Sequence, residues 1–151
     1  MARKIVIVED NPADAKTMRF ALASRDPTIE IVLLEDGARA VYFFSSARDN
    51  GDFLPCDLVL LDLNLPRVSG FEVLDFLKAD PELKKLPVVV LSGSSSQQDI
   101  ERCYAAGANS YVSKPTGIEE VLNMASSLVS FWFDYAQVPG SVRALRAKQT
   151  Y

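Results

Sequence analysis

The sequence contains no histidine, and among its 151 residues there are only two cysteines and one tryptophan. The absence of histidine excludes any reaction in which this chain supplies its own imidazole as a base or a metal ligand. Cys56 and Cys103 lack metal-ligand spacing, and we expect them to be buried core residues rather than a disulfide.

Long hydrophobic runs and an excess of positive charge are also missing. No stretch approaches the length of a membrane span, and the apolar segment 5–8 is too short for a signal peptide. The net charge of −4 argues against broad binding to nucleic acid or to anionic membranes. We therefore expect a cytoplasmic protein that has neither nucleic acid nor a membrane as a partner.

The sequence does have a regular alternation of strand-like and helix-like segments. Its 48% hydrophobic content suits one domain with a substantial core. Strands are predicted over residues 4–8, 30–35, 58–63, 87–92 and 109–112, and helices beginning near residues 11, 37, 70, 96 and 117. Because the strands are apolar throughout, we predict an α/β fold: a doubly wound five-stranded parallel sheet, in flavodoxin-like order 2-1-3-4-5, with helices on both faces.

Asp62 interrupts the most apolar of these segments, in which five of the six residues from 58 to 63 are hydrophobic. Pro66 cannot continue a central strand, so Asp62 is expected at the carboxyl end of its strand. Open α/β sheets bind their ligands at that edge. An ionised carboxylate among apolar residues is costly unless it is paired, and we therefore take Asp62 as the centre of the chemistry.

Polar residues also stand at the ends of other strands. Glu9 and Asp10 follow the first strand, Ser92 ends the fourth and Lys114 follows the fifth. Since the carboxyl ends of parallel strands share one edge, the acidic side chains should converge beside a hydroxyl and an ammonium group. Two carboxylates about 4 Å apart repel by about 4 kcal/mol at an effective dielectric near 20, so a cation is expected. Ligands that are all oxygen favour Mg²⁺ or Mn²⁺ over zinc.

A metal held by carboxylates beside a lysine suits the handling of phosphate. In such a site Asp62 can attack phosphorus as a nucleophile, while Lys114 and Ser92 stabilise the charge on the phosphoryl oxygens. The residues therefore predict phosphoryl transfer onto Asp62.

Two other classes share parts of this arrangement. A magnesium-dependent phosphatase of the haloacid-dehalogenase type would need a second acid two residues after the nucleophile, where this chain has Asn64. A flavin or nucleotide binder would need a Gly- or Ser/Thr-rich loop after the first strand, where this chain has the acidic segment 9–12.

Four motifs, in this order, resemble the receiver domain of two-component response regulators. They are Glu9-Asp10-Asn11, Leu60-Leu61-Asp62-Leu63-Asn64-Leu65-Pro66, Leu91-Ser92-Gly93 and Tyr111-Val112-Ser113-Lys114-Pro115. The resemblance covers residues 3–135 and implies that Asp62 accepts a phosphoryl group from a partner histidine kinase. It further implies that the chain is no enzyme beyond catalysing its own phosphorylation and dephosphorylation.

The same resemblance implies a metal site and a switch. Asp10, Asp62 and the main-chain carbonyl of Asn64 would bind Mg²⁺, with Glu9 acting largely through water. For the switch, it implies the pair Ser92 and Tyr111, and a phosphate contact from Lys114, positioned by a cis peptide bond to Pro115.

A narrower similarity concerns Asn11-Pro12-Ala13-Asp14 and Ser130-Phe131-Trp132-Phe133. Both segments are similar to stand-alone receivers that partner phytochrome histidine kinases. We expect a receiver domain over residues 1–136, with no effector domain, and a C-terminal tail over residues 137–151.

The last helix predicts a contact surface. At 100° per residue, a core-facing arc contains Ile118, Val121, Leu122, Ala125, Leu128, Val129 and Trp132. Met124, Phe131 and Tyr135 fall on an apolar flank beside it, and such flanks are typical of contact surfaces. We therefore expect a homodimer through the last helix and the tail, which would dock on the partner subunit. The alternative is that these three side chains pack under the chain's own tail.

Overall fold

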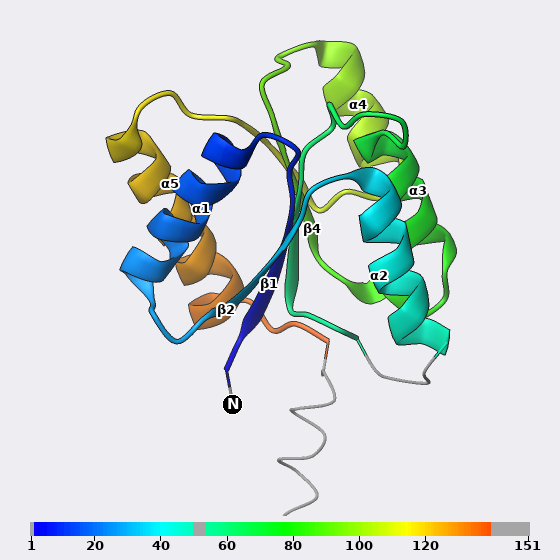
Figure 1. Cartoon of the computed structure of the whole chain (residues 1–151), viewed down its shortest axis with the longest axis horizontal. Coiled ribbons are helices and arrows are strands. Elements are labelled where there is room, and N and C mark those ends of the chain that lie inside the picture. The colour runs from blue at the N-terminus through cyan, green and yellow to red at the C-terminus, as the bar shows by residue number, and fades with distance from the viewer. Residues whose placement is uncertain (1, 50–53, 140–151) are drawn as a thin grey trace, which may run out of the picture.

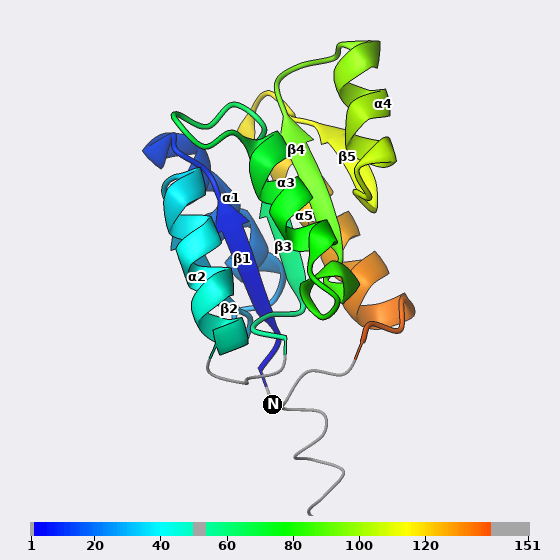
Figure 2. The same cartoon turned by 90° about the vertical axis from the view of Figure 1, so that its right-hand side faces the viewer.

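The structure, a computed structural model, describes residues 2–49 and 54–139. Five parallel strands form one sheet in the order β2-β1-β3-β4-β5, as predicted. The strands are β1 (Lys4–Val8), β2 (Glu30–Leu34), β3 (Leu58–Leu61), β4 (Val88–Ser92) and β5 (Ser110–Ser113). Five α-helices alternate with them and cover both faces of the sheet (Figures 1 and 2).

The helices begin close to their predicted positions. They are α1 (Pro12–Arg25), α2 (Gly37–Asp49), α3 (Gly70–Ala79), α4 (Gln97–Ala105) and α5 (Ile118–Val129), with a short 3-10 helix η1 (Leu83–Lys85) and a π-helix η2 (Ser130–Tyr135). Among the described residues, no helix is long and apolar enough to cross a membrane.

The core consists of two layers, one on each face of the sheet. On one face α1 and α5 pack against the sheet through side chains that include Leu22 and Ala125. On the other face α2, α3 and α4 pack through side chains that include Phe44, Leu74 and Cys103. The three central strands are therefore buried on both sides, which explains their continuous apolar sequence.

Local capping fixes where the helices begin and end. The Asn11 side chain accepts hydrogen bonds from the main-chain N–H groups of Ala13 and Asp14, as its sequence position predicts. Ser69 and Glu72 form a reciprocal capping box at the start of α3, which our sequence analysis did not identify. Gly107, which follows the end of α4, has φ of 102°, a conformation that favours glycine.

The end of the chain departs from the helical wheel used in the prediction. After Val129 the helix widens into the π-helix η2, so the spacing of 100° per residue no longer applies. η2 is held against the rest of the domain by an ion pair from Arg25 to Asp134 at 3.0 Å and by Arg3, which lies over the ring of Phe133.

Two predictions made from that wheel are wrong. Ile118, expected to face the core, is the first residue of α5 and is 51% exposed. Met124, expected on an exposed flank, is half-buried and lines a cavity beside the sheet. Phe131 and Tyr135 are exposed, at 55% and 78%. Of the tail, only residues 137–139 belong to the described part of the chain, and 140–151 lie outside it.

Side chains cover exposed main-chain groups at both edges of the sheet. At the β2 edge, Arg19 donates a hydrogen bond to the carbonyl oxygen of Ile31 at 3.3 Å. At the β5 edge, the hydroxyl of Tyr104 accepts a hydrogen bond from the main-chain N–H of Tyr111 at 3.2 Å. Neither of these groups is left free to pair with another strand.

Candidate functional site

An acidic cluster lies at the carboxyl edge of the sheet. Glu9 and Asp10 follow β1 and Asp62 follows β3, and one carboxylate oxygen of each lies within 4.8 Å of the others. Glu9 and Asp62 are buried, whereas Asp10 is exposed. The two strands are neighbours in the sheet, so residues 53 positions apart meet here, as the predicted strand order requires.

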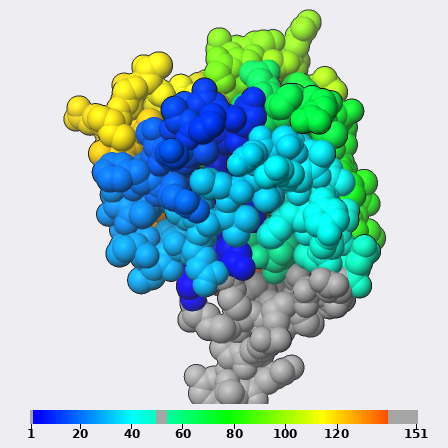
Figure 3. Space-filling model, in the orientation of Figure 1, coloured from blue at the N-terminus to red at the C-terminus, as the bar shows by residue number. Residues whose placement is uncertain are grey.

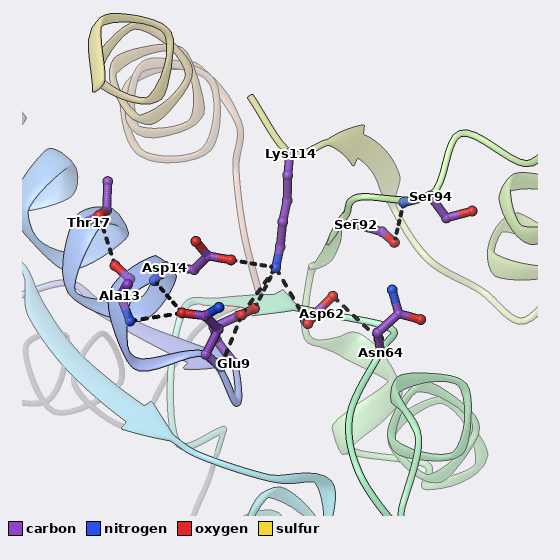
Figure 4. Close-up of polar contacts among 10 residues, drawn as sticks. Glu9, Ala13, Asp14, Thr17, Asp62, Asn64, Ser92, Ser94 and Lys114 are labelled. Atoms are coloured by element: carbon purple, nitrogen blue, oxygen red, sulfur yellow. Dashed lines mark hydrogen bonds and ion pairs between the residues drawn. The ribbon is translucent and has the colours of Figure 1, made fainter. Parts of the chain in front are cut away.

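Lys114 reaches into this cluster from the segment after β5 (Figure 4). Its Nζ lies 3.1 and 3.0 Å from the two carboxylate oxygens of Glu9 and 3.5 Å from Oδ2 of Asp62. It also lies 3.2 Å from Oδ2 of Asp14, in the first turn of α1. Figure 3 shows the first turn of α1 (dark blue) and the segment after β5 (yellow) at the same end of the molecule.

The electrostatics of the cluster are those of an incompletely neutralised anionic site. Burial raises the pKa of Glu9 to about 7, the hydrogen bond from Lys114 lowers it, and the charge of Asp62 raises it again. Burial alone would lower the pKa of Lys114, but its contacts with Glu9, Asp62 and Asp14 raise it. One ammonium group therefore faces several carboxylates, a balance that favours a further cation.

The main chain around Asp62 is held on two sides. Its N–H donates to the carbonyl oxygen of Val8 at 3.0 Å, and Oδ1 of its side chain accepts from the N–H of Asn64 at 3.4 Å. On the other side, a Cβ at Gly70 would lie 2.2 Å from the Asp62 carbonyl oxygen, so α3 begins directly against the main chain of the site. Sequence analysis placed Gly70 before a helix but did not find this contact.

Ser92 and Tyr111 meet at the same residue of the β4–α4 segment. The buried Ser92 hydroxyl accepts from the N–H of Ser94 at 3.1 Å, and the Tyr111 hydroxyl donates to the Ser94 carbonyl oxygen at 2.7 Å. The Ser94 hydroxyl donates in turn to Asp99 in the first turn of α4, at 2.7 Å. Ser94 therefore joins the two residues of the expected switch to a helix at the surface.

The peptide bond between Lys114 and Pro115 is trans, as are all peptide bonds in the part of the chain that the structure describes. The expected cis bond is wrong. The trans form is intrinsically the more stable one for an X–Pro bond, and with it Nζ of Lys114 already reaches Glu9 and Asp62.

Asp14 is a site residue that sequence analysis did not identify. From the sequence, its carboxylate is explained by the positive end of the helix dipole, which favours an acid in the first turn. The sequence does contain a signal for this role. Asp14 lies in the first turn of the helix that follows β1, and that turn lies at the same edge of the sheet as the carboxyl end of β1. The contact itself depends on the extended side chain of a lysine 100 residues away, which no local pattern encodes.

A cavity of about 70 Å³ adjoins the cluster. Its walls come from the sheet, α1 and α5, and its polar lining includes Glu9, Asp14, Asp62 and Lys114. The apolar lining includes Met124, which accounts for the partial burial of that residue. Lys114 and apolar residues of the α1–α5 layer therefore line the same cavity.

Comparison with known proteins identifies the family. The family model described as "Response regulator receiver domain" matches residues 5–126. The response regulator Rcp1 of Synechocystis sp. is 33% identical over 91% of this chain and 93% of its own length. The probable methanogenesis regulatory protein FilR2 of Methanothrix harundinacea is 37% identical over 90% of this chain and 87% of its own length.

Solved structures agree with the sequence matches. The phosphorylated cyanobacterial phytochrome response regulator RcpA superposes with a TM-score of 0.85 at 36% identity, covering 93% of this chain and 100% of that chain. The Mn²⁺-bound form of Rcp1 superposes with a TM-score of 0.82 at 33% identity, covering 91% and 99%. The chain belongs to the receiver domain family of response regulators. Neither the family model nor these relatives supports the phosphatase alternative.

Proposed function

We propose that Asp62 is the phosphoacceptor of this receiver and that a partner histidine kinase supplies the phosphoryl group. The observation that carries the proposal is the placement of the Asp62 carboxylate, 3.5 Å from Lys114 and within the acidic cluster of Glu9 and Asp10. In the transfer, a carboxylate oxygen of Asp62 forms a new bond to phosphorus while the P–N bond of the partner's phosphohistidine breaks. The electron pair of that bond remains on the imidazole nitrogen, and the product is an acyl phosphate.

A divalent cation, Mg²⁺ or Mn²⁺, fits the donors at this site. Glu9, Asp10 and Asp62 present carboxylate oxygens within 4.8 Å of one another, and Asn64, whose main-chain carbonyl is the further proposed ligand, stands two residues after Asp62. Such a set of oxygens suits hard cations. The cation would neutralise phosphoryl oxygens, while Lys114 supplies a second positive charge from the protein.

We propose that Ser92 and Tyr111 convert this modification into a change of surface. A phosphoryl group on Asp62 adds anionic oxygens that can accept a hydrogen bond from the Ser92 O–H. The oxygen of the same hydroxyl accepts from the N–H of Ser94, so movement of Ser92 toward the phosphoryl group would also move or break the bond to Ser94. Because Tyr111 and Asp99 both bind Ser94, a shift of that residue would alter α4 and β5 together. The function is the resulting shift in population, with no reaction on other substrates.

The experiment is labelling with a small acyl phosphate, acetyl [³²P]phosphate, in the presence of Mg²⁺. The wild-type chain should acquire label that hydroxylamine removes, and Asp62→Asn should acquire none. Asp75→Asn, an exposed aspartate of α3, is the matched control and should label normally. Label that persists in Asp62→Asn, or that resists hydroxylamine, contradicts the assignment.

Regarding the kinase, we propose a phytochrome histidine kinase in the cytoplasm, where ATP supplies phosphoryl groups. The similarity to the phytochrome response regulator RcpA over 93% of this chain supports this partner. The match to FilR2 shows that the fold and length are shared more widely. Phosphotransfer from a set of purified kinases tests the choice: a phytochrome kinase should transfer faster than unrelated kinases, and equal or slower transfer would contradict it.

We also propose a homodimer formed through α5, η2 and the tail that follows. Phe131 and Tyr135 expose large aromatic rings on η2, and Phe131 packs edge-to-face on Trp132. Exposed aromatic side chains are typical of subunit contacts. Met124 is not part of this surface, because it lines the cavity.

A further inference from the structure

Asp14 touches the proposed phosphorylation site without belonging to its acidic cluster. The carboxylate of Asp14 projects from the first turn of α1 and lies 3.2 Å from Nζ of Lys114. The side chain is 51% exposed, in contrast to the buried Glu9 and Asp62. It therefore engages the lysine from the solvent side of the site.

The ammonium group of Lys114 has three N–H donors. Hydrogen bonds run to both oxygens of Glu9 and to Asp14, whereas the contact with Asp62 is an ion pair at 3.5 Å. Figure 4 shows Asp14 and Asp62 on opposite sides of Nζ. A stronger hydrogen bond to Asp14 would therefore move the ammonium group away from Asp62, the proposed phosphoacceptor.

We propose that Asp14 is a positioning residue that competes with the phosphoryl group on Asp62 for the ammonium group of Lys114. The inference rests on the proposed phosphorylation of Asp62 and adds a residue that controls its rate. Through this contact α1 and the segment after β5 share one ion pair, so the phosphorylation state also changes how these two segments are joined.

The size of the effect follows from the exposure of Asp14. Exposed ion pairs are weak, since water and salt screen them. Loss of the Asp14 carboxylate should therefore accelerate phosphoryl transfer by about twofold to fivefold rather than by orders of magnitude. The effect should appear in the maximal rate and leave the half-saturating concentration of the phosphodonor unchanged, because Asp14 acts on the amine and not on donor binding.

The experiment measures labelling rates with acetyl phosphate and Mg²⁺ as a function of donor concentration. Asp14→Asn should raise the maximal rate, and Asp14→Glu should restore the wild-type rate by keeping the charge within reach of Lys114. Glu119→Gln is the control: Glu119 is exposed in the first turn of α5 and makes no hydrogen bond or ion pair within the described part of the chain. It should leave the rate unchanged, which separates the contact from a general loss of negative charge.

A double-mutant cycle completes the test. In the Lys114→Gln background, Asp14→Asn should have no effect, because the competing amine is gone. The inference is overturned if Asp14→Asn gives the same acceleration in the Lys114→Gln background, or if it gives no acceleration when Lys114 is present. Either result leaves labelling at Asp62 intact. A wild-type chain that takes up no label overturns the proposed function as well.

Discussion

Gly70 packs directly against the main chain of Asp62: an added Cβ would lie 2.2 Å from the Asp62 carbonyl oxygen and 2.6 Å from Cα of Leu63. The contact is with backbone, which cannot move aside as a flexible side chain can. We predict that Gly70→Ala lowers the free energy of unfolding by about 1–3 kcal/mol, the usual range for overpacking. Urea unfolding measures this loss, and slower labelling of Asp62 should accompany it.

Gly93→Ala is the matched control for that substitution. Gly93 is close in sequence to Ser92, but a Cβ there would meet no atom within 4 Å. Its unfolding midpoint should stay near that of the wild type. Equal effects of the two substitutions would show that close approach to Asp62 is not what requires glycine at position 70.

The pKa of Glu9 predicts a dependence of stability on pH. Because burial raises this pKa from its ordinary value of 4.5 to about 7, the folded state holds a proton that the unfolded state loses. The stability that this proton contributes is complete below about pH 4.5 and is lost as the pH rises through about 7.

Glu9→Gln removes this titration. The difference in free energy of unfolding, variant minus wild type, is measured without metal, in EDTA. This difference should be larger at about pH 8 than at about pH 5, by about 1–3 kcal/mol. Urea unfolding of both proteins at the two pH values measures the difference. A difference that stays constant or shrinks with pH would contradict the assignment. Added Mg²⁺ should reduce it, since a cation favours the ionised carboxylate.

The hydrogen bond from Tyr111 to Ser94 predicts a local effect. Tyr111→Phe removes a hydroxyl that donates at 2.7 Å and should lower the free energy of unfolding by about 0.5–1.5 kcal/mol. Hydrogen exchange at the amides of residues 93–96 should become faster, because the segment loses one of its attachments. Tyr42→Phe, on the 75% exposed Tyr42 of α2, should change neither property.

The exposed aromatic side chains of η2 predict the state of association. Replacing Phe131 and Tyr135 together by alanine should shift the chain toward monomer in light scattering over a concentration series. Phe20→Ala, at a 58% exposed phenylalanine of α1, should leave the association unchanged. A wild-type chain that remains monomeric at high concentration, with or without phosphorylation, would refute the dimer.

The strand order and the acidic site could be predicted because each depends on a local pattern. A continuous apolar segment indicates a doubly covered strand, and the polar residue after it lies at a known edge. Glu9 and Asp62 lie at the same edge of the sheet because of that rule. The helical caps at Asn11 and Gly107 are equally local.

The rest depends on features that no window of sequence contains. The helical wheel was wrong at two positions within α5, Ile118 and Met124, because hydrophobic periodicity does not encode which neighbouring elements cover a given side chain. Ile118, at the first position of α5, is exposed although its place on the wheel is that of a core residue. The contact of Asp14 with Lys114 depends on the rotamer of a long side chain from another element.

The hydroxyl of Tyr104 and the guanidinium of Arg19 have a consequence for assembly. Because these two side chains hydrogen-bond main-chain groups of the edge strands β2 and β5, we expect the sheet to resist the addition of a strand from a neighbouring molecule. We therefore expect partners to bind helices and loops rather than the edges of the sheet.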